Sequence, residues 1–104
     1  MDSLIQQLQK TIEALELLNE KPATAGEQID ELLDQLFQQK IDLLRVTCNA
    51  ASPAFQQALQ ALQQAAIKSS RTVKEPARLG EMTKAVSDAI GKLAKLLDSA
   101  HPLG

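Results

Sequence analysis

The sequence predicts an all-α protein, an up-down-up-down four-helix bundle, and three observations lead to that fold class. Apolar residues recur at three- and four-residue steps through most of the chain, which is the spacing of amphipathic helices. Ala, Leu, Gln, Glu and Lys are abundant while Trp and Tyr are absent, which favours helix over sheet. Short breaks separate the periodic segments, and short connections make consecutive helices antiparallel neighbours. We expect helices at residues 2–19, 25–49, 53–71 and 76–100.

The first helix, residues 2–19, has one leucine away from its apolar face. Leu17 falls on the polar side, where a single exposed leucine is ordinary but also suits an edge contact with a partner. The helix ends before Pro22, which a helix interior cannot accommodate. Thr24, with Glu27 three residues later, is a capping box for the next helix. The apolar face holds Leu4, Ile5, Leu8, Ile12, Leu15 and Leu18.

The second helix has the widest apolar stripe and is the expected centre of the bundle. At about 100° per residue the stripe covers roughly half of the helix circumference, so this helix should touch more than one neighbour. Phe37, like Phe55 in the third helix, lies where a core would bury it. The stripe holds Ile29, Leu32, Leu33, Leu36, Phe37, Ile41, Leu43, Leu44 and Cys48.

Lys40 lies near the middle of this stripe, where burial of an unpaired ammonium is costly. Two interpretations remain open. The aliphatic stem can cover the core while the ammonium reaches water. Alternatively, the ammonium can meet a carboxylate of another helix and fix the register of a bundle or dimer interface.

The third helix begins with a strong signal, Ser52 as the N-cap followed by Pro53 at the first helical position. Its apolar face is rich in alanine, which lets a neighbouring backbone come close but buries little area per turn. A pair of helical hairpins that completes its core only by dimerising is therefore the alternative architecture. Val73 stays in phase with the apolar face, so this helix can extend past Ser70, while Ile67 lies off the face.

The fourth helix is expected to start at Pro76 and to end at Ala100. Gly91 lies near its polar side, at a cost of roughly 1 kcal/mol relative to alanine. The final residues, from His101 to Gly104, are expected to fray.

The length and the cysteine content bound the class of protein. At 104 residues we expect one helical-bundle domain, residues 1–104. A single cysteine cannot form an internal disulfide, which favours a reducing compartment. We see neither a signal peptide nor an apolar run long enough to span a bilayer, so we expect a cytoplasmic protein that is not integral to a membrane.

The two halves of the chain differ in charge. Residues 1–50 contain nine acidic and four basic residues, and residues 51–104 contain four acidic and seven basic residues, which gives −5 and +3. These charges can steer the two halves, or two molecules, together. An ordinary solvated surface is the simpler explanation, because exposed ion pairs contribute little each.

No residue pattern indicates catalysis, a metal site or a cofactor. His101 is the only histidine and lies in the tail, whereas phosphotransfer and di-iron bundles need histidines on their helices. Cys48 is expected near a helix C-terminus, which disfavours a thiolate, and fits a small buried hydrophobe. The acidic residues of the second helix lie on a rigid helix, whereas a calcium ion is normally bound by a loop that wraps around it. We therefore expect a protein that is not an enzyme.

A basic series around the third connection is the best candidate contact for an anionic partner. Binding to nucleic acid normally needs a stronger positive field and aromatic residues that stack on bases, so an acidic protein surface is the simpler match. The series is Lys68, Arg71, Lys74 and Arg78.

These observations predict a non-enzymatic protein–protein interaction module, an adaptor, accessory subunit or regulator that binds a protein partner or forms a homo-oligomer. The wide stripe of the second helix, the off-face Leu17 and Ile67, and the charge difference support association. The alternative is an amphipathic protein whose helices open to coat a lipid or polymer surface, although the first two helices lack the aromatic and basic pattern of interfacial helices. Candidate partner contacts are Leu17, Lys40, Ile67, Lys68, Arg71, Lys74 and Arg78.

Overall fold

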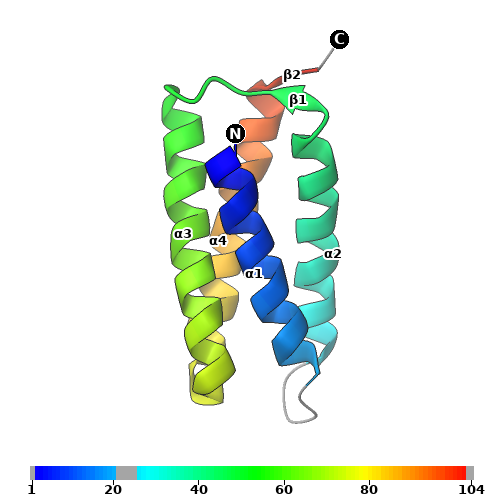
Figure 1. Ribbon diagram of the computed structural model, residues 1–104, viewed down its shortest axis with the longest axis vertical. Helices are drawn as coiled ribbons and strands as arrows, with labels where there is room; N and C mark the ends of the chain where they lie inside the picture. The colour runs from blue at the N-terminus through cyan, green and yellow to red at the C-terminus, as the bar shows by residue number, and fades with distance from the viewer. Residues whose placement is uncertain (1, 21–25, 103–104) are drawn as a thin grey trace.

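The computed structural model describes residues 2–20 and 26–102, and within them the chain forms a bundle of four long helices (Figure 1). This confirms the predicted all-α four-helix fold class. A 3-10 turn precedes the last helix, and two very short strands pair at one end of the bundle. The elements are α1 (Asp2–Asn19), α2 (Gly26–Leu43), β1 (Val46–Thr47), α3 (Pro53–Lys74), η1 (Pro76–Arg78), α4 (Leu79–Ser99) and β2 (His101–Pro102).

The helices form a square in which α2 and α3 occupy opposite corners. Helices α1 and α4 each pack against both α2 and α3, whereas in the described ranges α2 and α3 make no comparable contact with each other. Figure 1 shows α1 in front of α4, with α3 on one side and α2 on the other, and the colours show successive helices running in alternating directions. Consecutive helices are therefore neighbours for α1–α2 and α3–α4, as expected, but not for α2–α3.

The segment that joins α2 to α3 is long enough for this diagonal arrangement. Residues 44–52 can extend over about 30 Å, which exceeds the diagonal of a square with sides of about 10 Å. They cross the end of the bundle, as Figure 1 shows. As a result α1 and α3 run parallel as neighbours, and so do α2 and α4.

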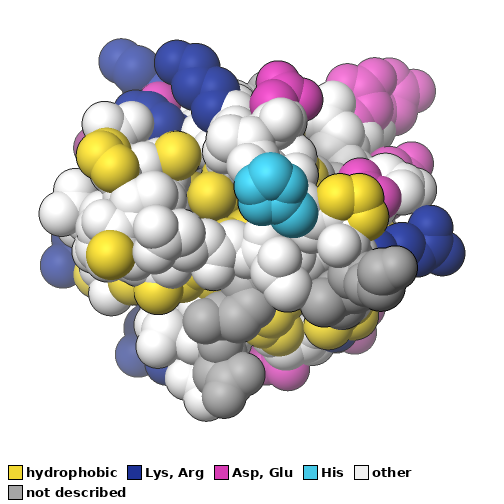
Figure 2. Space-filling view, turned by 90° about the horizontal axis from the view of Figure 1, so that it is seen from above, with side chains coloured by type: hydrophobic (Ala, Val, Ile, Leu, Met, Phe, Trp, Pro, Cys, Tyr) yellow, Lys and Arg dark blue, Asp and Glu magenta, His cyan; other side chains and the backbone are white. Residues whose placement is uncertain are grey.

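Acidic and basic residues are unevenly distributed among the helices of this square. The α2 segment contains five acidic residues and one basic residue, whereas the α3 segment contains three basic residues and no acidic one. Figure 2, seen from above, shows most of the visible Lys and Arg side chains toward α3 and most of the visible Asp and Glu side chains toward α2. The two opposite corners of the bundle therefore carry charge of opposite sign.

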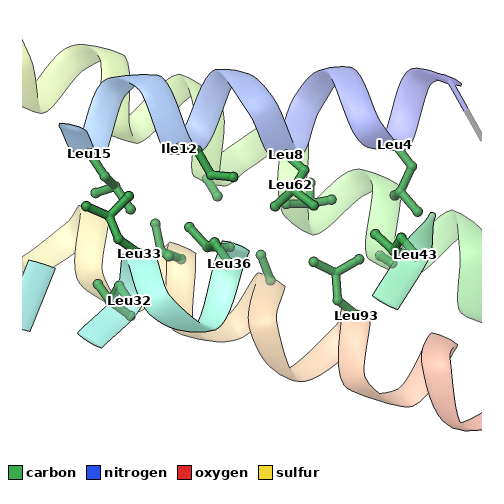
Figure 3. Close-up of a cluster of buried hydrophobic side chains, with 14 of the residues drawn as sticks. Leu4, Leu8, Ile12, Leu15, Leu32, Leu33, Leu36, Leu43, Leu62 and Leu93 are labelled. Atoms are coloured by element: carbon green, nitrogen blue, oxygen red, sulfur yellow. The ribbon is translucent and has the colours of Figure 1, made fainter. Parts of the chain in front are cut away.

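The apolar faces of all four helices meet in one core inside a single chain (Figure 3). The leucine-rich face of α1 points toward α2, α3 and α4, and α3 contributes mostly small residues, as its alanine-rich sequence predicts. The core does not require a second copy of the chain. Its members include Leu4, Leu8, Ile12, Leu15, Leu18, Ile29, Leu36, Leu43, Phe55, Ala58, Leu62, Ala65, Met82, Val86, Ala89, Leu93 and Leu96.

Helix α2 ends at Leu43, six residues before the predicted end at residue 49. Its last turn tightens: the backbone N–H of Leu44 donates to the Lys40 carbonyl at 3.2 Å, and that of Arg45 donates to the Asp42 carbonyl at 3.1 Å. The next residues, Val46 and Thr47, are β-branched and adopt the extended strand β1.

The tail that was expected to fray forms β2, which pairs antiparallel with β1. Val46 lies opposite Pro102 and Thr47 opposite His101, and the Thr47 hydroxyl donates to the His101 carbonyl at 3.4 Å. Pro102 has no N–H to donate, and such a residue is tolerated in a strand at the edge of a sheet. The prediction of a frayed end is wrong for His101 and Pro102, while residues 103 and 104 lie outside the described residues.

The remaining boundaries differ from the predicted ones by a few residues. Ser52 is the N-cap of α3, and its hydroxyl accepts the Phe55 N–H at 3.2 Å, as predicted. Helix α3 continues to Lys74, three residues past the predicted end, because Val73 stays in phase and packs against the core. The predicted helix at 76–100 is the turn η1 followed by α4, which ends at Ser99. The predicted capping box cannot be compared, because Thr24 lies outside the described residues.

Candidate interaction surface

Large apolar side chains on the surface are gathered in two places. Among the described residues, five large hydrophobic side chains are between 42 and 59 % exposed. Three of them belong to α2 or directly follow it, and the other two belong to α1 and α3. They are Leu17, Phe37, Ile41, Leu44 and Ile67.

The first group lies on the outer face of α2. Phe37, Ile41 and Leu44 follow one another at steps of four and three residues, so they share one face of the helix. The expectation that Phe37 belongs to the core is wrong, whereas Phe55 is buried there. The predicted stripe is wider than its neighbours α1 and α4 can cover. The bundle therefore buries one edge of the stripe, and the other edge faces solvent.

Two acidic residues continue the same face toward the start of α2. Asp30 and Asp34 precede Phe37 by seven and three residues and are exposed. We call the five residues Asp30, Asp34, Phe37, Ile41 and Leu44 the outer α2 strip. The Asp30 carboxylate accepts a hydrogen bond from the Asn19 side chain at 2.7 Å. The strip is therefore acidic in its first half and apolar in its second half.

Asp34 and Arg45 carry the charges that are free at the two ends of the apolar part. Both residues are exposed, and neither has an ion-pair partner among the residues that the structure describes. Arg45 directly follows Leu44, and the hydrogen bond from its N–H to Asp42 keeps it close to the path of α2.

Lys40 lies between the core and the outer α2 strip. The residue is half-buried, and its ammonium donates to the Gln9 side-chain oxygen on α1 at 2.6 Å. This contact joins two helices, as one of the two interpretations of Lys40 requires, but its acceptor is an amide and not a carboxylate. The stem covers part of the helix contact while the charged end lies at its margin.

Gln39, which the sequence reasoning did not single out, is a polar residue inside the contact between α2 and α4. It is only 8 % exposed, and its side-chain nitrogen donates to the Ile90 carbonyl at 2.8 Å. Its side-chain oxygen is buried without a hydrogen-bond partner in the described part of the chain. The sequence does contain a signal for the burial of Gln39. This residue lies three residues after Leu36 and four before Leu43, and both of these leucines are core residues.

The second apolar group lies along the groove between α1 and α3. Leu17 borders a shallow depression of about 260 Å³ together with Val73, and Ile67 borders another of about 370 Å³ together with Arg71. Both depressions are also lined by Lys10 and Ser70, so they are parts of one surface, which we call the α1–α3 groove. The structure thus brings together Leu17 and Ile67, which the sequence marked separately.

The basic series is divided between different surfaces. Lys68 lines a groove of about 640 Å³ between α3 and α4, whereas Arg71 belongs to the α1–α3 groove. Lys74 is exposed at the end of α3.

Arg78 is engaged by neighbouring carboxylates. Its guanidinium donates to Glu75, and another of its nitrogens lies 3.5 Å from Glu81. The hydrogen bond from Arg78 holds the pKa of the Glu75 carboxyl below its ordinary value. Arg78 is therefore engaged by two carboxylates, and the contact of the basic series with an anionic partner stays a prediction.

The reactive side chains lie near the end of the bundle that contains β1 and β2. Cys48 is half-buried against the core, and burial raises the pKa of its thiol. His101 is exposed on β2. Within residues 2–20 and 26–102, His, Cys, Asp and Glu side chains form no group of three or more that could hold a metal ion.

No helix in the described part of the chain is both long and apolar enough to cross a membrane. Comparison with known proteins returned no matching family model, no matching curated protein and no matching solved structure.

Proposed function

We propose that this protein is a non-enzymatic protein–protein interaction module that serves as an adaptor, accessory subunit or regulator. One observation carries the proposal: the five large exposed hydrophobic side chains are grouped in the outer α2 strip and the α1–α3 groove and are not scattered. Apolar surface that is gathered in this way and bordered by polar residues is typical of protein contact sites.

The borders of the two surfaces suit recognition of a protein. Lys10, Glu13 and Arg71 surround the apolar residues of the α1–α3 groove, so the groove offers both signs of charge around a hydrophobic centre. Charges at the rim of an interface contribute mainly to orientation and association rate. We propose the cytoplasm as its compartment, because its single cysteine is a thiol that needs no oxidising environment.

The alternative function, a coat on a lipid or polymer surface, requires the helices to open. The leucine-rich faces that would have to contact the surface are enclosed in the core of this bundle. Opening the bundle would expose these faces to water, at a free-energy cost of about 25 cal/mol per Å² of apolar surface. We therefore favour protein contact through surfaces that are already exposed.

The test compares proteins captured from the native source by the parent chain and by two double variants. We expect Leu17→Glu/Ile67→Glu to lose specific partners, because it places two carboxylates in the α1–α3 groove. The matched control is Gln57→Glu/Gln64→Glu, which adds the same charge on exposed sites of α3 that line the groove between α3 and α4. The control should retain every partner that the parent captures, as measured by quantitative mass spectrometry.

Either of two results would contradict the proposal. One is that no protein is enriched over an empty support, and the other is that both double variants retain the same partners as the parent. Circular dichroism of each variant establishes beforehand that the bundle is folded.

A further inference from the structure

We propose that the outer α2 strip binds the same strip of a second copy of this chain, with the two α2 helices antiparallel. This inference rests on the proposed function, because it assigns an occupant to one of the two contact surfaces. It is carried by the spacing of the strip, by its distribution of charge and by the exposure of all five of its residues.

The spacing of the strip is that of a helix-pairing seam. Its residues follow one another at steps of four, three, four and three, the heptad spacing with which two helices pack side by side. The residues that face the core of the bundle, such as Ile29, Leu36 and Leu43, form a different line on α2. The bundle itself leaves this second seam without a covering helix.

The order of residue types along the strip makes it complementary to itself when reversed. In an antiparallel pair, Phe37 of each copy can lie opposite Ile41 of the other copy. The same register places Asp34 opposite Leu44 of the second copy. Arg45 of that copy is then only one residue along the axis, about 1.5 Å, from the level of Asp34.

This register forms two identical ion pairs around a central apolar contact. Asp34 and Arg45 are the two exposed charges at the ends of the apolar part of the strip, and both lack an ion-pair partner among the described residues. A parallel pair would instead bring the like charges of the two copies together. Electrostatic complementarity therefore selects the antiparallel arrangement and a closed, two-fold dimer.

The contact between the two strips is small. The strip covers two heptads, and such a contact buries less surface than a standard protein interface. We expect a reversible dimer with a dissociation constant on the order of 10 to 100 µM. Each copy keeps its own core, so dissociation leaves folded monomers.

The test exchanges the two charges in separate variants. In Asp34→Arg the new guanidinium faces Arg45 of the second copy, and in Arg45→Asp the new carboxylate faces Asp34 of the second copy. Because like charges then meet at both ends of the contact, we expect each variant to dimerise at least about tenfold more weakly than the parent. In an equimolar mixture of the two variants, a mixed dimer pairs an arginine with an aspartate at each end in this register, so the mixture should dimerise more strongly than either variant alone and approach the parent's affinity.

The double variant Asp34→Arg/Arg45→Asp restores both ion pairs with their charges exchanged. It should regain the parent's affinity, which a merely structural effect of either substitution would not allow. Sedimentation velocity over a concentration series that reaches roughly 500 µM measures the parent, the two single variants, their mixture and the double variant.

The control is Gln28→Arg/Gln35→Arg, which makes the same change in net charge as Asp34→Arg on exposed sites of α2 away from the strip. It should dimerise like the parent. The proposal is wrong if the parent stays monomeric over the whole series, if the single variants dimerise like the parent, or if the double variant fails to regain dimer. A contact between α2 and a different face of the second copy would give this last result.

The outcome is independent of the test of the α1–α3 groove. A monomeric parent whose captured partners still depend on Leu17 and Ile67 would overturn the self-association and leave the proposed function standing. A dimer that captures no other protein would leave self-association as the only contact of this module.

Discussion

Gln39 shows how one buried amide shapes the contact between α2 and α4. Its nitrogen donates to the Ile90 carbonyl, while its oxygen is buried without a hydrogen-bond partner among the described residues. A net hydrogen bond contributes about 1 kcal/mol, and a buried polar atom without a partner costs about as much or more. The residue therefore adds little to stability, and its hydrogen bond mainly defines how the two helices align.

We expect Gln39→Met to unfold with a free energy within about 1 kcal/mol of the parent, or higher, because methionine fills a similar volume and removes the unpaired oxygen. Gln39→Ala removes the same hydrogen bond but also leaves a cavity, so it should be less stable than Gln39→Met by about 2 kcal/mol. Urea unfolding followed by circular dichroism measures both. A loss of more than about 2 kcal/mol in Gln39→Met would show that the hydrogen bond to Ile90 is a major stabilising contact.

At the scale of the helices, the sequence predicts where most elements begin more accurately than where they end. Ser52 and Pro53 mark the start of α3, because both residues have a specific role at a helix N-terminus. The end of α2 had no such mark, because Leu44 and Cys48 continue the apolar periodicity past Leu43. Beyond that end the chain forms β1, which pairs with β2, a strand that is distant in sequence.

Periodicity also could not separate the two edges of the α2 stripe. Phe37 and Ile41 fit the apolar side of the helix as well as Leu36 does, but only Leu36 is buried. Burial depends on how far the neighbouring helices reach around α2, which is a property of the assembled bundle. For the same reason the sequence indicated Leu17 and Ile67 as off-face residues but could not place them in one groove.

Helix α4 contains a glycine that the fold does not require. Gly91 is exposed, and a Cβ atom at this position would meet no atom within 4 Å. We expect Gly91→Ala to raise the free energy of unfolding by about 0.5–1 kcal/mol, because alanine loses less conformational freedom in a helix. Thermal unfolding at matched concentration measures the change.

Gly80→Ala is the comparison for this prediction. Gly80 has equally open surroundings but lies in the first turn of α4, where helix propensity matters less. Its gain should be smaller than that of Gly91→Ala. A decrease in stability for Gly91→Ala would mean that this surface of α4 is covered in solution.

At the scale of the whole molecule, the four helices could be predicted from the sequence but their neighbours could not. Apolar faces predict that each helix contributes to a core, without specifying the helix on the other side of it. The connection at residues 44–52 is short by sequence but long enough to reach the opposite corner. The diagonal placement of α2 and α3 follows from packing and not from any local signal.

The diagonal arrangement predicts a specific cross-link between α1 and α3. Leu17 and Val73 line the same depression, so cysteines at both positions, in a Cys48→Ala background, should react efficiently with a short bis-maleimide. Cysteines at Gln38 on α2 and Gln63 on α3, both exposed, should remain unlinked within one molecule. Peptide mass spectrometry of the monomer fraction distinguishes these results. Linkage of the second pair and not of the first would contradict the arrangement.

The crossing of residues 44–52 also determines how the peptide dipoles of the bundle are arranged. Because α1 and α3 run parallel as neighbours, their N-termini lie side by side at the end of the bundle that contains β1 and β2. The C-termini of α2 and α4 lie together at the same end. Each N-terminus carries about half a positive charge and each C-terminus about half a negative charge. That end therefore has one edge of positive and one edge of negative backbone potential, which a bundle of strictly antiparallel neighbours would cancel.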